Sequence, residues 1–307
     1  MFEEIAFVIV PVLLMAGVGY AISRSSLDID SESLGRLVVM VGTPSLVFST
    51  LTSPDLPELS LSGTVQAALL VTVCAGSLST GFLLLTRQPI RSFLPSLTLP
   101  NSGNVGLPVV LLAFGQQGLA IGVAFFFVIA LLQYSFVPAI MDGRFSLTRI
   151  LKEPLVYALL AVFLFRLTDT TPHPIILQTT ELLGGMMIPV MVILLGYSLG
   201  QLQVSDLRLS LILALARIVI GTTSGLLVIW LLGLQGVEAG SVFLMASMPC
   251  AMVIYLFALR YNRAPRRVAG LVVVSTLMTF SVLPVLLWIG IAISKGSLPF
   301  FSFLGGA

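Results

Sequence analysis

Ten apolar runs follow one another along the chain, and they restrict its fold more than any other feature. A helix needs about 20 mostly apolar residues to cross a bilayer. By this criterion we predict ten membrane spans, at residues 3–23, 34–52, 62–86, 91–114, 117–140, 154–168, 175–200, 207–233, 239–260 and 267–293. Only 9% of the 307 residues are charged, which is too few to cover a water-soluble domain of this size. We therefore predict an all-α, polytopic membrane protein.

Residues on which several other function classes depend are missing from these runs. The net charge of +2 is small and the basic residues are scattered, so nucleic acid is not an expected partner. Cys74 and Cys250 lie within apolar runs, and His173 is the single histidine, so neither a disulfide framework nor a metal site is indicated. None of the 13 acidic residues lies at mid-membrane, which leaves no acid–base pair for an intramembrane enzyme. We expect no catalytic residue and no cofactor.

The basic residues are distributed unevenly between the two sides of the predicted membrane. Loops after the odd-numbered spans hold twelve Arg and Lys residues, whereas the opposite side holds only Arg166 and Lys295. Since cytoplasmic loops are rich in Lys and Arg, we expect the loops after the odd-numbered spans to lie in the cytoplasm and both termini to lie on the outer side of the cell membrane. The first run has no basic n-region and no small-residue cleavage site, so we expect a retained span and not a signal peptide.

Residues 98–109 interrupt the fourth span and do not fit a regular helix. Pro100 and Pro108 each remove a helical hydrogen bond, and Gly103 and Gly106 weaken the helix further. Three polar residues lie between the prolines: Asn101, Ser102 and Asn104. Backbone groups freed in a bilayer must be satisfied by protein or by a water-filled cavity. We therefore predict helix breaks at Pro100, Gly106 and Pro108 that form part of a binding site, with a simple kink patched by neighbouring helices as the alternative.

A weak internal repeat relates the two halves of the chain. Residues 37–44 in span 2 resemble residues 182–189 in span 7, and Pro138 in span 5 matches Pro284 in span 10 at nearly the same spacing. In span 9, Pro249 corresponds to the first proline of span 4, which predicts a second helix break there. The repeat is weak in sequence but consistent in position.

Each repeat would contain five spans, an odd number, so the second must enter the membrane from the opposite face. We predict inverted five-helix repeats at residues 1–142 and 150–295, with broken helices 4 and 9 that cross. Inverted repeats with discontinuous helices at their interface are typical of secondary transporters, whose site lies near the bilayer midplane.

Both signs of ligand charge are compatible with such a crossing. The half-helices predicted to begin near Gly106 and Cys250 would direct N–H groups into the cavity, which favours an anion such as a carboxylate. A cation would instead use the carbonyl ends of the first half-helices. Because carriers coupled to Na⁺ or H⁺ usually keep a carboxylate at depth, coupling here would rely on neutral groups, or transport is uncoupled.

Arg217 stands apart from the other basic residues because it lies inside span 8, roughly 15 Å deep at about 1.5 Å per residue. An intramembrane arginine is costly and by default faces a cavity or a partner. We expect its guanidinium either to attract an anionic substrate or to extend to the cytoplasmic headgroups.

The motifs around the two predicted breaks resemble those of a known family. Residues 99–108 are similar to the span-4 motif of the auxin efflux carrier family, which includes plant PIN carriers and bacterial carboxylate transporters. Residues 248–262 are similar to its span-9 motif, and the resemblance covers nearly the whole chain. The chain lacks the long hydrophilic loop that many plant members carry between spans 5 and 6, which favours a microbial carrier.

The resemblance implies a scaffold domain of spans 1, 2, 6 and 7 and a transport domain of spans 3–5 and 8–10. It also implies a homodimer, an elevator-like motion and a substrate carboxylate at the crossing beside Asn101. Tyr134 matches a substrate-contacting tyrosine by position, and its neighbour Gln133 either lines the site or bridges helices. The predicted substrate-binding residues are Asn101, Ser102, Gly103, Asn104, Gln133, Tyr134, Arg217, Pro249 and Cys250.

We therefore expect a secondary transporter of small organic anions, such as auxin-like or malonate- and malate-like carboxylates. A sodium-coupled symporter of the related bile-acid type is the alternative within the carrier class. A membrane sensor that binds the same ligand without moving it is the alternative outside that class. Polarity alone does not identify the anion or the direction of transport.

Overall fold

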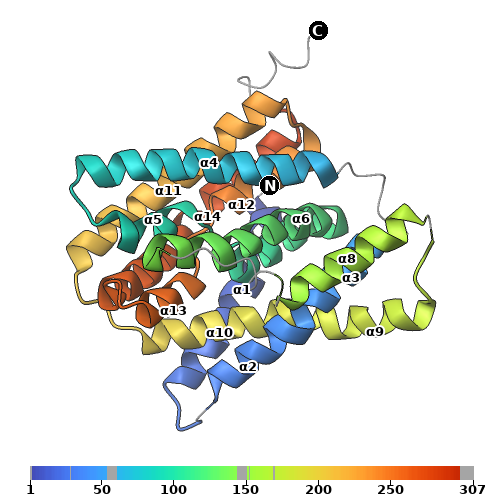
Figure 1. Cartoon of the computed structure of the whole chain (residues 1–307), viewed down its shortest axis with the longest axis horizontal. Coiled ribbons are helices and arrows are strands. Elements are labelled where there is room, and N and C mark those ends of the chain that lie inside the picture. Colours follow the sequence, from blue (N-terminus) through green and yellow to red (C-terminus); the bar gives the residue numbers. More distant parts are fainter. Residues whose placement is uncertain are drawn as a thin grey trace. The chain divides into compact units, whose positions relative to one another are not determined.

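The computed structural model describes residues 2–27, 29–53, 61–143, 151, 153–168 and 170–297. Every regular element in these ranges is a helix, joined by turns and one isolated β-bridge (Figure 1). The all-α prediction is thus confirmed for the described chain. Arg144, Arg149 and Lys152, which we counted among the cytoplasmic basic residues, lie outside it.

Contacts within the chain divide it into two compact units. Unit 1 consists of Met1–Val10, Ser60–Phe145 and Leu202–Ala307. Its elements are α4 (Leu61–Leu85), α5 (Ile90–Thr98), the π-helical turn η2 (Ser102–Gly106), α6 (Leu107–Asp142), α11 (Leu207–Leu232), α12 (Gly236–Ala246), α13 (Val253–Arg260) and α14 (Pro265–Ser294). Helix α1 (Phe2–Ser23) begins in unit 1 and passes into unit 2 at Pro11.

Unit 2 consists of Pro11–Leu59 and Ser146–Gln201. Besides the remainder of α1, its elements are α2 (Ser31–Leu37), the π-helical turn η1 (Val38–Gly42), α3 (Thr43–Thr52), α8 (Pro154–Leu167), α9 (Pro174–Gly185) and α10 (Met187–Gln201). Helix α3 packs against α8 and α9 and forms the centre of this unit. Both of its longer helical stretches are irregular near their middle, one at η1 and the other at Met186, between α9 and α10.

Seven helical stretches of the described chain are long and apolar enough to cross a membrane. They are Glu3–Ser23, Ser31–Thr52, Ser62–Leu85, Ser102–Asp142, Pro174–Gln201, Leu207–Leu232 and Pro265–Ser294. Two shorter apolar helices, Pro154–Leu167 and Gly236–Ala246, accompany them. The protein is therefore a multi-pass membrane protein.

The long stretch that ends at Asp142 is not one straight helix. Gly115 has φ 65° and ψ −152°, which lie outside the helical region, so the backbone turns sharply at this residue. A positive φ strains residues that carry a Cβ, and glycine adopts it readily. The turn falls between the ranges that we predict for spans 4 and 5, 91–114 and 117–140.

Helix α11 occupies the middle of unit 1, where it packs against α4, α5, α12 and α14. Its outward face is apolar, with Leu215 and Val219 more than half exposed. Its inward face instead carries Arg217 and Gly221, both buried. An apolar exterior around a more polar interior is the arrangement expected of a helix in lipid, because the bilayer core offers no partner to polar groups.

Candidate functional site

Two helices of unit 1 stop in the middle of the unit and resume a few residues later. Helix α5 ends at Thr98, and the helical backbone resumes at Ser102 with η2. Helix α12 ends at Ala246, and α13 begins at Val253. Leu99 is extended, and the two interruptions lie side by side at Pro100 and Cys250.

The interruptions pair through their backbones as an isolated antiparallel β-bridge. The Asn101 N–H donates to the Pro249 carbonyl oxygen over 2.8 Å, and the Ala251 N–H donates to the Leu99 carbonyl oxygen over 3.4 Å. In the apolar surroundings of a membrane protein each of these groups would otherwise remain unsatisfied, at a cost of several kcal/mol. Each broken helix therefore supplies partners for the other. We call these paired segments the crossing.

The helix breaks at Pro100 and Pro249, and the additional breaks that we predicted at Gly106 and Pro108 are wrong. Gly106 has helical angles, φ −64° and ψ −51°, and Pro108 lies in the first turn of α6. The reason is the π-helical turn η2, in which the Gly106 N–H reaches back to the Asn101 carbonyl oxygen over 3.1 Å. A π-helical turn joined to the start of a helix accommodates a proline without interrupting the backbone.

Asn101 caps the first turn of η2. Its Oδ1 accepts a hydrogen bond from the Asn104 N–H over 3.3 Å, and its side chain is only 4% exposed. Its Nδ2 has no hydrogen-bond partner in the described chain, and neither has the buried Oγ of Ser102. Gly103 follows, close against the ring of Phe126, which leaves no space for a larger side chain. Two buried polar groups next to a helix start are thus left without a hydrogen-bond partner among the described residues.

Gln133 and Tyr134 bring α6 alongside the crossing. The Gln133 Nε2 donates to the Pro100 carbonyl oxygen over 3.4 Å. Of the two roles that we considered for Gln133, this is the one in which it bridges helices. The Tyr134 ring lies edge to face with Phe257 of α13, with 6.0 Å between ring centroids. Both predicted residues therefore contact the broken helices, each on a different one.

Cys250 is fully buried in the second interruption, where its backbone forms the β-bridge with Pro100. Its N–H donates to the Oγ of Ser275 on α14 over 3.2 Å. The half-helix that we predicted to begin near Cys250 begins instead at Val253, because Pro249 and Ala251 are hydrogen-bonded to the backbone of the first interruption. The helical N–H groups of α13 therefore start three residues later than expected.

Arg217 reaches both half-helices that end at the crossing. Its Nη1 donates to the Leu97 carbonyl oxygen of α5, and its Nη2 donates to the Ala246 carbonyl oxygen of α12, each over 2.9 Å. The residue is 1% exposed, so the alternative in which it extends to the headgroups is wrong. The geometry instead makes Arg217 a shared cap for two helix C-termini, whose carbonyl groups carry partial negative charge.

Comparison with known proteins bears on what such a crossing does. A model of the family described as "membrane transport protein" matches residues 143–289. An uncharacterized transporter of Methanothermobacter thermautotrophicus is 26% identical over 299 residues, which cover 91% of this chain and 96% of the relative. An uncharacterized transporter of Methanocaldococcus jannaschii is 24% identical over 301 residues, which cover 92% of this chain and 96% of the relative. These matches confirm the resemblance to the auxin efflux carrier family. The chain is a membrane transporter.

Sequence reasoning missed one side chain that shapes the crossing of this transporter. Ser275 supplies the acceptor for the Cys250 N–H, and its own hydroxyl donates to the Val272 carbonyl oxygen over 3.2 Å. Several other hydroxyls lie on the same predicted span, and nothing in the sequence distinguishes Ser275 from them. Its position becomes evident only when α14 is seen packed against the interruption.

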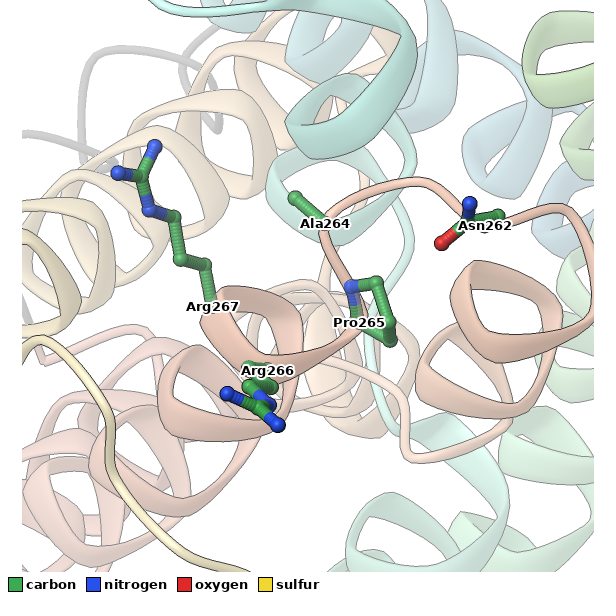
Figure 2. Close-up of a pocket in the computed structure, with 5 residues that line it drawn as sticks. All are labelled: Asn262, Ala264, Pro265, Arg266 and Arg267. Carbon is green, nitrogen blue, oxygen red and sulfur yellow. The ribbon is translucent and has the colours of Figure 1, made fainter.

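The transporter also has an open cavity of about 360 Å³ outside the crossing (Figure 2). It is lined by Asn262, Ala264, Pro265, Arg266 and Arg267, at the start of α14. Figure 2 shows the guanidinium groups of Arg266 and Arg267 pointing in different directions, so they do not converge on one ligand. None of the predicted substrate-binding residues lines this cavity.

Proposed function

We propose that the transporter carries small organic carboxylates by a secondary, elevator-type mechanism, with the substrate bound at the crossing. The proposal rests on one observation above the others. The Asn101 Nδ2 is buried without a protein partner, next to the start of a helix in the middle of unit 1. A buried donor left unpaired costs about 1–3 kcal/mol, and a carboxylate oxygen is the strongest acceptor that could satisfy it.

The charges around the crossing support an anionic substrate. The N-terminal ends of η2 and α13 each carry a partial positive charge, whereas the opposite partial charges on α5 and α12 are capped by Arg217. Among the described residues, no Asp or Glu forms an ion pair with this arginine. A carboxylate bound here would meet helix N-termini, neutral donors and a buried cation.

The helix positions support two inverted five-helix repeats, residues 1–142 and 150–295. The starts of α4, α5 and α6, at residues 61, 90 and 107, recur 146 residues later as the starts of α11, α12 and α13, at residues 207, 236 and 253. Pro138 of α6 and Pro284 of α14 have the same spacing. Both termini would then lie on the outer side of the cell membrane, as the distribution of basic residues suggests.

The two compact units support a separate transport domain and scaffold domain. Unit 1 contains the predicted spans 3–5 and 8–10, and unit 2 contains spans 2, 6 and 7 with most of span 1. We propose that unit 1 is the transport domain and that unit 2 is the scaffold, through which two copies form a homodimer. Because all residues of the crossing belong to unit 1, they would move across the membrane as one body.

Uptake into proteoliposomes tests the proposal. Wild-type protein should take up at least one labelled compound from a panel of monocarboxylates, dicarboxylates and indole-3-acetate, above the level of protein-free vesicles. Asn101→Ala should lower this uptake about tenfold or more, because a hydrogen bond to a charged group contributes roughly 1.5–3 kcal/mol. Ser77→Ala is a matched control, since its exposed hydroxyl bonds only to its own helix.

Three outcomes would count against parts of the proposal. Uptake by Asn101→Ala equal to that of the wild type would remove Asn101 from the site. Binding of a carboxylate without uptake would favour the sensor alternative. Absence of both binding and uptake for the whole panel would remove carboxylates as the substrate class.

A further inference from the structure

The two half-helices that end at the crossing leave carbonyl groups that their own helices do not satisfy. The Leu97 carbonyl lacks its usual helical donor because the Asn101 N–H is used in the β-bridge. The Ala246 carbonyl lacks its donor because the Cys250 N–H donates to Ser275. Both carbonyls lie at helix C-termini, where the partial charge is negative. Two such ends close together form a site for a positive charge.

In transporters with discontinuous helices, carbonyl groups at half-helix C-termini commonly coordinate the coupling Na⁺. Oxygen ligands of this kind suit hard cations. In this chain the guanidinium of Arg217 already holds both carbonyls at 2.9 Å, one with each terminal nitrogen. The positive charge that the arrangement requires is therefore part of the protein.

We propose that Arg217 permanently occupies the cation subsite of the crossing, so that the transporter binds its anion without a coupling metal cation. This inference rests on the proposed function, because it concerns how the same site takes its carboxylate. Arg217 acts through the half-helices that it caps and through its charge, and it is therefore a positioning residue. The bound carboxylate supplies the counter-charge that no described Asp or Glu side chain provides.

The helix that carries Arg217 is adapted to this position. One turn later lies Gly221, where a Cβ would collide with the Ala246 carbonyl oxygen and approach the Arg217 Nη1 to 3.3 Å. At the spacing of 146 residues, the corresponding residues on α4 are Val71 and Ala75, which are 2% and 0% exposed. The arginine–glycine pair thus occurs on α11 alone, and one guanidinium serves both half-helices.

The first test needs no variant. Wild-type proteoliposomes are assayed for uptake of labelled malonate and of labelled indole-3-acetate, with sodium chloride or with choline chloride on both sides. Equal uptake in the two salts is the expected result. Uptake that requires sodium would overturn the inference while leaving carboxylate transport intact. If neither compound enters in either salt, the proposed function fails for these probes, and the stability test below still decides the inference.

The second test removes the guanidinium. This test uses no carboxylate and keeps each salt at a concentration too low for guanidinium to denature the protein. The melting temperature of purified Arg217→Ala should then rise on addition of guanidinium or sodium chloride relative to choline chloride, because the two carbonyls are open to a free cation. The wild type and Arg208→Ala, an exposed arginine on the same helix, should not respond. Arg217→Lys, which keeps the charge, should respond less than Arg217→Ala. Equal responses of wild type and Arg217→Ala would overturn the inference.

Discussion

The two interruptions at the crossing share a backbone arrangement but differ in their side chains. The first presents a capping asparagine and a buried serine, each with a polar atom that no described group satisfies. The second, residues 247–252, has no such side-chain atom. The Ser247 hydroxyl donates to the Phe243 carbonyl oxygen, and the Cys250 and Ala251 N–H groups donate to Ser275 and Leu99. Both are needed to pair the backbone, but the unsatisfied side-chain atoms lie only on the first. The crossing is therefore symmetric in its backbone pairing and asymmetric in its unsatisfied polar groups.

The helices beside the interruptions show the same asymmetry. Helix α11 carries Arg217 and Gly221, whereas α4 carries Val71 and Ala75 at the corresponding positions. A second buried arginine on α4 would add a charge that the two carbonyl ends could not neutralise. The one guanidinium on α11 already bonds to both carbonyl groups.

The largest effect should come from changing the polar interruption without unfolding it. Asn101→Asp keeps the oxygen that caps η2 but replaces the free amide donor with a negative charge. Carboxylate affinity should fall about 100-fold or more, since a lost hydrogen bond to a charged group and like-charge repulsion act together. Isothermal titration of detergent-solubilised protein measures the loss. Cys250→Ser, the equivalent change in the other interruption, should weaken binding far less; an equal loss would contradict the asymmetry.

An intermediate effect is expected where α11 approaches the crossing. Gly221→Ala places a Cβ against the Ala246 carbonyl oxygen, and overpacking of this kind typically destabilises by about 1–3 kcal/mol. A comparable change on the other helix, Gly76→Ala, meets only the Thr98 side chain, whose nearest atom is the methyl carbon at 3.7 Å, and should be neutral or stabilising. Thermal unfolding in detergent compares the two. Similar melting temperatures for the two variants would show that α11 is not held as closely as described.

Effects of the same size or smaller should come from the side chains that hydrogen-bond to the interruptions from neighbouring helices. Ser275→Ala leaves the buried Cys250 N–H without its acceptor and should destabilise by about 1–3 kcal/mol. Gln133→Leu removes a long hydrogen bond to the Pro100 carbonyl oxygen, and about 1 kcal/mol or less is expected because an under-satisfied carbonyl is better tolerated. Ser281→Ala, an exposed hydroxyl on α14, is the control. A larger effect for Gln133 than for Ser275 would reverse the order.

Much of the interrupted fold follows from the sequence, because prolines lack the N–H that a helix needs. Pro100 and Pro249 mark the two breaks correctly. The sequence does not reveal that Gly106 and Pro108 belong to a π-helical turn and a helix start, because that depends on which carbonyl each N–H reaches. Local composition predicts that a helix is interrupted but not where it resumes.

Arg217 shows a different limit of sequence reasoning. Its place in an apolar run predicted either a role at depth or extension to the headgroups, and could not decide between them because its two partners lie 120 and 29 residues away along the chain. A signal was nevertheless present. Neither α5 nor α12 has a basic residue in its last turn, so the carbonyl groups at their ends had to find donors elsewhere. Considering helix ends together with isolated charges would have suggested the connection.

The fixed charge of Arg217 has an electrical consequence for the proposed elevator. With a monovalent anion bound, unit 1 would carry no net charge at the crossing, whereas the empty unit would carry one positive charge. Membrane voltage would then act on the return of the empty protein, by up to about 2.3 kcal/mol per 100 mV for a full transit. In a cell with a negative interior, the voltage would favour the state in which the positively charged empty site faces the cytoplasm. In that state the site would bind anions from inside the cell.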